Sequence, residues 1–216
     1  MDLDKWATAY IREVHENWLG LVQRSPCYKS GYSVFYSPVV MHPGLMVIGY
    51  NPGGGSDSFD PTREQQLSTK HDYFVSDYPL ARRMRRLFES IGKTSLLASS
   101  VKTNMIFFRT RNVDEWNSIE LRIRKDLRRF CLEKNIELIR IIQPSVVLTE
   151  GIDTYSILKQ ELRITGDDVL RFKGRSLFIK NHSSSPKLLG MIHPSGARVS
   201  NDEWKLIQER LILELP

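Results

Sequence analysis

The feature that most constrains the fold is a continuous apolar run, Leu45-Met46-Val47-Ile48-Gly49-Tyr50, which stops abruptly at Asn51-Pro52-Gly53. A strand without polar positions is buried on both faces, which is typical of a parallel sheet covered by helices. Three further segments are predicted strands, at Val101–Phe108, Ser145–Thr149 and Leu188–Ile192. The chain is therefore predicted to contain a central, mostly parallel four-stranded sheet.

Segments with apolar residues at helical spacing alternate with these runs. The spacing predicts helices over residues 7–22, 80–91, 119–139, 152–162 and 204–215, and Ser176–Ile179 indicates a short edge strand. Strands that alternate with helices favour an α/β fold, a three-layer α/β/α sandwich. A length of 216 residues suits one domain over residues 1–216, with residues 1–40 as an N-terminal helical extension.

Composition narrows the class of protein. The two cysteines, Cys27 and Cys131, are far apart, which favours neither a disulfide framework nor a metal site. The first residues lack a signal-peptide pattern, and no apolar stretch approaches the ~18 residues that span a membrane. The net charge of +6 is compatible with a polyanionic partner. We expect a cytoplasmic, monomeric protein that uses neither a metal nor a cofactor.

Polar residues stand near the predicted strand ends. Asn51 follows the first strand, Asn104 lies within the second, and His193 follows the last. In open parallel sheets, ligands bind beyond the carboxyl ends of the strands. The sequence therefore predicts that these three side chains meet at one edge of the sheet.

The loop after the first strand, Gly49-Tyr50-Asn51-Pro52-Gly53-Gly54, is suited to close contact with a ligand. Glycine lets the backbone approach a ligand, and proline stiffens the turn that carries Asn51. Taken alone, such a loop could be a phosphate cradle or merely a tight turn. It lacks the Gly-Lys-Ser/Thr ending of a P-loop and the glycine spacing of a dinucleotide site.

The loop after the last strand is His193-Pro194-Ser195-Gly196-Ala197-Arg198. A histidine at a strand end can donate a hydrogen bond to a developing anion. The Pro-Ser-Gly turn offers backbone N–H groups and a hydroxyl to a DNA phosphate. A lone histidine is commonly structural, but the two loops together indicate a site.

These two loops resemble the uracil-DNA glycosylase superfamily. Gly49-x-Asn51-Pro52-Gly53 is similar to the Gly-x-Asn-Pro-Gly motif of the single-strand-selective monofunctional and the mismatch-specific thymine/uracil branches. His193-Pro194-Ser195 is similar to the His-Pro-Ser of the uracil-specific and single-strand-selective branches. The ending Ser195-Gly196-Ala197-Arg198 resembles the Ser-Ala-Arg of the mismatch-specific branch, so the features are mixed. Residues 1–40 carry no such likeness.

The resemblance implies roles for three residues. Asn51 would position the attacking water, although an amide cannot take its proton as a carboxylate would. His193 would donate a hydrogen bond to uracil O2 as charge builds there. Asn104 would read the pyrimidine edge through its donor and acceptor. The alternative for Asn104 is a structural side chain that ties down a neighbouring loop.

The resemblance also implies a pocket for the flipped base. The loop residues Gly49, Tyr50, Pro52 and Gly53 would line it. A flipped base needs an aromatic stacking partner, which the family carries shortly after the first motif. The spacing departs from that pattern here, since residues 57–77 look like an insertion. Phe59, Tyr73 and Phe74 are candidates, and Phe74 is favoured.

Five residues are candidates for DNA contact. Ser195 and Gly196 would bind a phosphate, and Arg198 would fill the gap that the flipped base leaves. Lys102 and Arg109, with the neighbouring Arg111, are expected near the cleft edge, where they could contact phosphate. Two arginine-rich helices are predicted to present ordinary solvated faces, at Arg82, Arg83, Arg85 and Arg86, and at Arg122, Arg124, Lys125, Arg128 and Arg129.

The sequence thus predicts a monofunctional DNA glycosylase that acts on uracil or a related base in DNA. The alternative is a member of the same fold that binds nucleic acid without cleavage or acts on another base. An unrelated α/β hydrolase lacks support, because the chain contains neither a Gly-x-Ser-x-Gly elbow nor metal-ligand spacing. Uracil, hydroxymethyluracil, hypoxanthine and mismatched thymine remain open as the target base.

Overall fold

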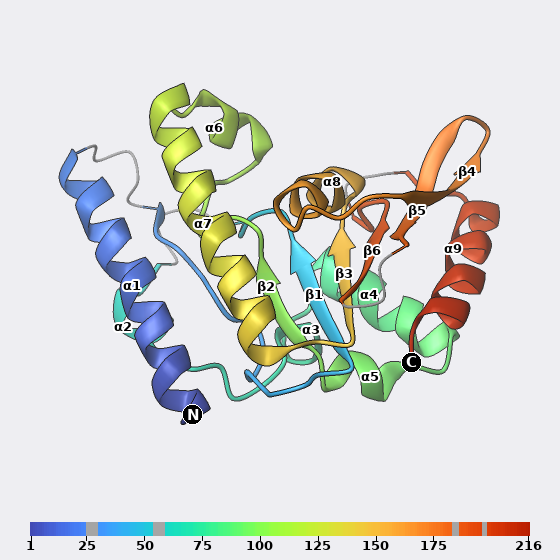
Figure 1. Ribbon diagram of the computed structural model, residues 1–216, viewed down its shortest axis with the longest axis horizontal. Coiled ribbons are helices and arrows are strands. Elements are labelled where there is room, and N and C mark those ends of the chain that lie inside the picture. Colours follow the sequence, from blue (N-terminus) through green and yellow to red (C-terminus); the bar gives the residue numbers. More distant parts are fainter. Residues whose placement is uncertain (25–29, 54–58, 183–185, 196–197) are drawn as a thin grey trace.

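A single six-stranded sheet organises the chain, with the strand order β2-β1-β3-β6-β5-β4 (Figure 1). The computed structural model describes residues 1–24, 30–53, 59–182, 186–195 and 198–216. Four neighbouring strands run parallel, namely β2 (Val101–Asn104), β1 (Leu45–Gly49), β3 (Val146–Glu150) and β6 (Lys187–Met191). The sheet continues antiparallel through β5 (Arg175–Asn181) and β4 (Asp167–Phe172).

The α/β class is confirmed, but the sheet is mixed and six-stranded rather than a four-stranded one. The missed strand is β4, whose residues are exposed or only half-buried and therefore form no apolar run. The segment predicted as an edge strand is β5, which lies inside the sheet between β4 and β6. β2 ends at Asn104, well short of the predicted Phe108, because the following residues pair with the loop after β1.

Helices cover both faces of the sheet, as Figure 1 shows. On one face, α1 (Leu3–Arg24), α7 (Leu121–Ile142) and α8 (Ile152–Glu161) contribute to one hydrophobic cluster. On the other face, the second cluster contains residues of α3 (Asp72–Val75), α4 (Pro79–Ser90), α5 (Thr94–Ala98) and α9 (Asn201–Glu214). Two short helices, α2 (Pro61–Glu64) and α6 (Val113–Ser118), complete the described elements.

Local sequence explains where these helices begin and end. Pro79 occupies the first turn of α4, where its missing N–H is not needed. Ser200 and Glu203 form a capping box at the start of α9. α7 ends at Ile142 and is capped by Gln143, which has a left-handed backbone and precedes Pro144. Within the described ranges, no helix is both long and apolar enough to cross a membrane.

The strand register decides which polar side chains share a face. Val47 pairs with Lys102 and Gly49 with Asn104, and side chains alternate between the faces along each strand. Val47 belongs to the cluster beneath α4 and α9, so Lys102 and Asn104 point to that face. Glu150, two residues after Leu148 of the same cluster, points there as well. One face therefore gathers charged groups at the carboxyl ends of the parallel strands.

Candidate functional site

A buried ion pair lies at the centre of the candidate site. Lys102 Nζ of β2 is 3.1 Å from Glu150 Oε2 of β3, and the two side chains are 4% and 0% exposed. The hydroxyl of Tyr73, from α3, donates a hydrogen bond to the other carboxylate oxygen, Glu150 Oε1. Burial and the Glu150 charge hold the pKa of Tyr73 well above its ordinary value, so Tyr73 keeps its proton as the donor. Glu150 Oε1 thus accepts a hydrogen bond, whereas Oε2 faces the ammonium in an ion pair and accepts no hydrogen bond from the described residues.

The ion pair orients Asn104. Lys102 Nζ is 3.3 Å from Asn104 Oδ1 and donates to it. Asn135 of α7 holds the adjoining backbone, because its Nδ2 donates to the carbonyls of Asn104 and Met105 at 3.3 and 3.1 Å. With its oxygen turned to the ammonium, the amide of Asn104 keeps Nδ2 as its donor group for any further partner.

Gly49 makes room for this cluster at the end of β1. A Cβ at this position would lie 2.2 Å from Asn104 Oδ1, 2.9 Å from Lys102 Nζ and 3.1 Å from Glu150 Oε2. A Cβ at this position would force Asn104 and Lys102 to shift. The glycine of the first motif therefore allows close packing against the polar cluster.

His193 stands at the same end of the sheet, two residues after β6. Its Nδ1 accepts a hydrogen bond from the backbone N–H of Ser195 at 3.3 Å, which places the proton of the neutral ring on Nε2. Burial lowers the pKa of His193, Glu150 opposes this effect, and Lys102 and Arg83 add to it. The neutral imidazole is therefore favoured, with Nε2–H as a donor.

His71 supports Tyr73 from the start of α3. The ring is 5% exposed, its Nδ1 accepts from Tyr73 N at 3.3 Å, and its Nε2 lies 3.0 Å from Ser100 Oγ. The Ser100 hydroxyl donates to Leu97 O, so its oxygen accepts from Nε2–H. Burial, followed by the charge of Lys102, lowers the pKa of His71 to about 4. His71 is therefore a neutral structural residue near neutral pH.

The two predicted motifs come to the same rim, with Glu150 of the intervening β3 between them. Gly49 adjoins Glu150 directly, and the charge of Glu150 acts on His193. Asn51 is directed elsewhere, since its Nδ2 donates to Thr110 Oγ1 at 2.7 Å and to Pro52 O at 3.4 Å. Among the described residues, no hydrogen bond joins Asn51 to His193. The amide of Asn51 can therefore offer only its Oδ1 acceptor to a water.

The rest of the first loop runs alongside the segment that follows β2. Tyr50 O accepts from Ile106 N at 2.8 Å, and Pro52 O accepts from Thr110 N at 3.3 Å. Tyr50 is half-buried and packs against the cluster beneath α1 and α7, whereas Gly53 is exposed. Of these residues only Gly49 is therefore in demonstrated contact with the polar cluster.

The residues predicted to contact DNA differ in exposure and lie in separate places. Lys102 is only 3% exposed and is held by Glu150, so the expectation that it binds phosphate is wrong. Arg109 is half-buried and lines a separate cavity of about 270 Å³ beside Phe108. Ser195 Oγ lies 3.4 Å from His193 Nδ1, and Arg198 is exposed. Gly196 lies outside the described residues.

The predicted stacking residue, Phe74, is not part of the polar cluster. It is 38% exposed, packs edge-on against His71 and lines a surface cavity with Arg82 and Arg85. The neighbouring residue, Tyr73, is the one that enters the cluster, because successive side chains of a short helix diverge. Phe59, the other candidate, packs against Trp18 and Tyr32 on the opposite face of the sheet. The described residues thus leave the stacking partner unassigned.

The sequence analysis missed Glu150, and although it named Tyr73 as a stacking candidate, it missed the contact of Tyr73 with Glu150. Glu150 carried a usable signal, because a carboxylate two residues after the apolar run Val146–Leu148 is unusual at a buried strand end. Tyr73 carried none, since the segment between Asp57 and Asp77 has no periodicity that fixes its position. Its placement depends on α3 packing over the sheet.

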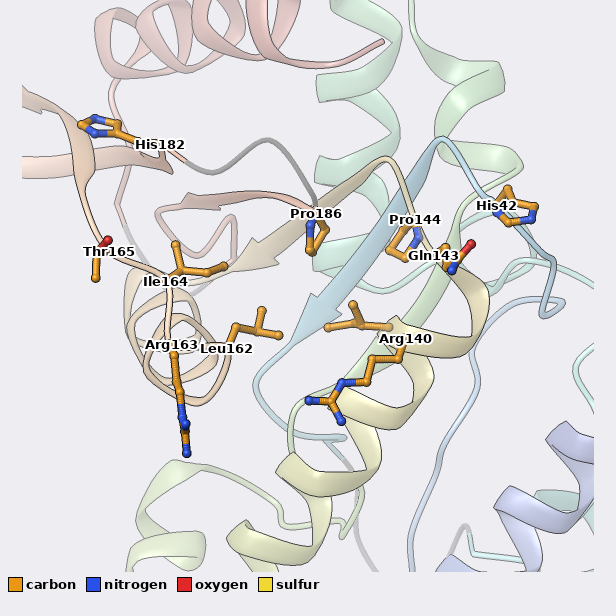
Figure 2. Close-up of a pocket in the computed structure, with 11 residues that line it drawn as sticks. His42, Arg140, Gln143, Pro144, Leu162, Arg163, Ile164, Thr165, His182 and Pro186 are labelled. Atoms are coloured by element: carbon orange, nitrogen blue, oxygen red, sulfur yellow. The ribbon is translucent and has the colours of Figure 1, made fainter.

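A cavity of about 980 Å³ lies at the opposite end of the sheet (Figure 2). His42, Pro144 and Pro186 line it, and these residues precede β1, β3 and β6. Arg140, in the last turn of α7, also lines it, where a cation offsets the partial negative charge of the helix end. This cavity is therefore separate from the polar cluster, and its cationic lining has a structural explanation.

Two further observations bear on function. Within the described part of the chain, no group of three or more His, Cys, Asp or Glu side chains is placed to hold a metal ion. The sequence matches no protein-family model and no curated protein.

Proposed function

We propose that this protein is a monofunctional DNA glycosylase, which flips uracil or a related base out of DNA and hydrolyses its N-glycosidic bond. The observation that carries the proposal is the position of Asn104, Gly49 and His193 at the carboxyl ends of parallel strands, where Asn104 and Gly49 adjoin one buried ion pair whose charges act on His193. That end of an open parallel sheet is where ligands bind. The positive net charge supports a polyanionic substrate.

The orientation of Asn104 supports recognition of a carbonyl. Its Oδ1 is held by Lys102, so Nδ2 donates to the ligand. Uracil carries the O4 acceptor on its pairing edge, where cytosine carries an amino donor. A donor facing an amino group would leave both polar groups unpaired, at a cost of about 1–3 kcal/mol. The site therefore favours uracil over cytosine.

His193 supplies stabilisation to the leaving base. In the proposed reaction, the bond from C1′ to the base nitrogen breaks and its electron pair stays on the base. Nε2–H of neutral His193 donates a hydrogen bond to O2, where part of this charge accumulates. A preorganised donor of this kind lowers the free-energy barrier by about 2.7–4 kcal/mol.

Water completes the hydrolysis. It adds to C1′ of the sugar cation, and its proton passes to solvent while the base anion later takes a proton from solvent. Asn51 Oδ1 accepts a hydrogen bond from this water but does not remove the proton. Glu150 is not suited to that task either, because Tyr73 and Lys102 occupy its oxygens. Bond cleavage before water attack is therefore the route that the side chains support.

The alternative is a divergent member that binds nucleic acid without cleavage. One observation favours it, since both described hydrogen bonds of Asn51 lead to the segment after β2 and to its own loop. A direct assay separates the two functions. The protein is incubated with a uracil-containing oligonucleotide, and abasic sites are then cleaved with alkali.

We expect alkali-sensitive product with the natural chain and a rate about 10²–10³-fold lower with His193→Ala. Asn104→Ala should also lose activity, because no amide donor of the protein then faces O4 of the uracil. His182→Ala is the matched control, since His182 is exposed and lines the cavity at the other end of the sheet. No product with the natural chain, or full activity in His193→Ala, would overturn the proposed reaction.

A further inference from the structure

A second cavity, of about 760 Å³, adjoins the His193 loop between α4 and α9. Its size lies within the usual range for ligand pockets. The residues that matter here are Arg83 and Arg86 of α4, Ser195 and Arg198 of the connecting segment, and Trp204 and Gln208 of α9. No aspartate or glutamate is among its described lining residues.

The arginines of α4 divide into two pairs with different surroundings. Arg82 and Arg85 form ion pairs with Asp77 at 3.0 and 2.9 Å. Arg83 and Arg86 are exposed, as predicted for these arginines, and both line the cavity.

The cavity arginines are available to an anion. None of the ion pairs among the described residues involves Arg83, Arg86 or Arg198. Arg83 is anchored through a hydrogen bond from its guanidinium to Pro194 O. Arg86 also borders Glu89 at a neighbouring cavity, but these two described side chains form no ion pair. Three guanidinium groups that form no ion pair among the described residues favour an anionic ligand, and phosphate matches their forked donors.

Trp204 adds an aromatic wall. It packs against the second hydrophobic cluster and is half-buried, so its indole is fixed while part of it borders the cavity. Gln208 Nε2 donates to Ser90 Oγ at 2.8 Å and links α9 to α4 at the edge of the cavity. Nucleobases stack on such fixed aromatic rings irrespective of their sequence. Arginines beside an indole therefore suit a nucleotide, with its phosphate on the arginines and its base on the indole.

The cavity borders the loop that carries His193. Ser195 lines it, and Ser195 Oγ is 3.4 Å from His193 Nδ1. Arg83 lines it too, and the charge of this residue acts on His193. A DNA strand with its flipped base at His193 would therefore pass directly over the arginines.

We propose that this cavity binds the nucleotide adjacent to the excised one, with its phosphate on Arg83, Arg86 and Arg198 and its base stacked on Trp204. This inference rests on the proposed function. A base held against Trp204 has left the duplex stack, so the cavity favours uracil in single-stranded DNA over uracil in a duplex.

The experiment measures binding of fluorescent single-stranded pentanucleotides that contain a central 2′-fluorinated deoxyuridine, which resists cleavage. We expect Arg86→Gln/Arg198→Gln to weaken binding about tenfold or more, as charged hydrogen bonds are lost. Trp204→Leu should weaken it about fivefold or more through lost stacking. Arg82→Gln, the matched charge removal on the same helix, should change affinity by less than about twofold.

Two outcomes would overturn the cavity proposal. One is equal affinity for Arg86→Gln/Arg198→Gln and Arg82→Gln at the same salt concentration. The other is an unchanged ratio of single-stranded to duplex binding in the double variant, which we expect to fall. Trp204→Phe keeps an aromatic ring, so it should restore part of the affinity that Trp204→Leu loses if stacking, rather than folding, is responsible.

The test separates this inference from the proposed reaction. The same variants are measured on an oligothymidylate that contains no uracil, for which the cavity contacts should persist. Loss of binding in the double variant without uracil excision by the natural chain would remove the glycosylase proposal and retain the cavity. Uracil excision by the natural chain together with unaltered binding in the variants would retain the glycosylase proposal and remove the cavity proposal.

Discussion

Lys102 Nζ lies 3.1 Å from Glu150 Oε2, and this ion pair joins two strands that are separated by β1 in the sheet. Two charges can meet across that strand because the residue between them is Gly49, whose missing side chain leaves the space. The pair costs desolvation energy, which a direct contact and added hydrogen bonds offset. Tyr73 and Asn104 provide those bonds.

Breaking the pair on one side should be strongly destabilising. Lys102→Met leaves Glu150 as an uncompensated buried charge, and we expect the free energy of unfolding to fall by about 3–5 kcal/mol. Lys102→Met/Glu150→Gln removes both charges and should recover most of this loss. Urea unfolding of Lys102→Met, Glu150→Gln and the double variant measures the coupling energy between the two side chains. Strictly additive losses of unfolding free energy would contradict this coupling.

The same double variant tests how Asn104 is oriented. Without the Lys102 ammonium, the amide of Asn104 is free to turn and present either its donor or its acceptor. We expect the preference for uracil over cytosine, measured as a ratio of excision rates in matched oligonucleotides, to fall at least about tenfold. An unchanged ratio in the folded double variant would show that Lys102 does not set the orientation.

Gly49→Ala should disturb the site through one methyl group. The added Cβ would lie 2.2 Å from Asn104 Oδ1, so Asn104 must move. We expect a loss of about 1–3 kcal/mol in the free energy of unfolding, the usual cost of overpacking, and a clear loss of uracil excision. Gly53→Ala is the control within the same loop, because a Cβ there meets nothing within 4 Å. Equal behaviour of the two variants would argue against the close packing.

Stability should depend on pH through His71. Its pKa is about 4 in the folded protein and about 6.5 when unperturbed, so the unfolded chain binds more protons between these values. Stability is therefore present above pH 6.5 and is lost as the pH falls towards 4, by about 3 kcal/mol in total. Urea unfolding at pH 7, 5.5 and 4.5 measures this loss. His71→Gln should show a shallower loss, and an identical slope would exclude His71 as the cause.

Excision should be lost only at acidic pH. Burial lowers the pKa of His193, so the ring stays neutral below the ordinary value of 6.5. Protonation would place a hydrogen on Nδ1, against the Ser195 N–H that now donates to it. We expect the single-turnover rate constant to stay level from pH 8 to 6.5 and to decline below that. A decline centred above pH 6.5 would contradict a neutral His193.

Much of the scaffold was predictable because burial leaves a strong pattern. The strand Leu45–Gly49 and the run Leu188–Met191 of β6 are buried throughout, so their positions and the loops that follow them could be predicted. β4 could not, because its half-exposed residues lack such a pattern. The position of Phe74 outside the polar cluster has a related reason, since no periodicity in that segment shows which side chain turns inward.

The sequence by itself determined the α/β class, the buried strands and the two motif loops at their ends, because these depend on local hydrophobicity and turn residues. The tertiary structure decided that Lys102 pairs with Glu150 instead of reaching DNA, and that Arg83 and Arg86 face a cavity while Arg82 and Arg85 face Asp77. Each of these outcomes depends on strand register and helix rotation. Register and rotation are fixed by packing between segments far apart in the chain, so no local pattern could reveal them.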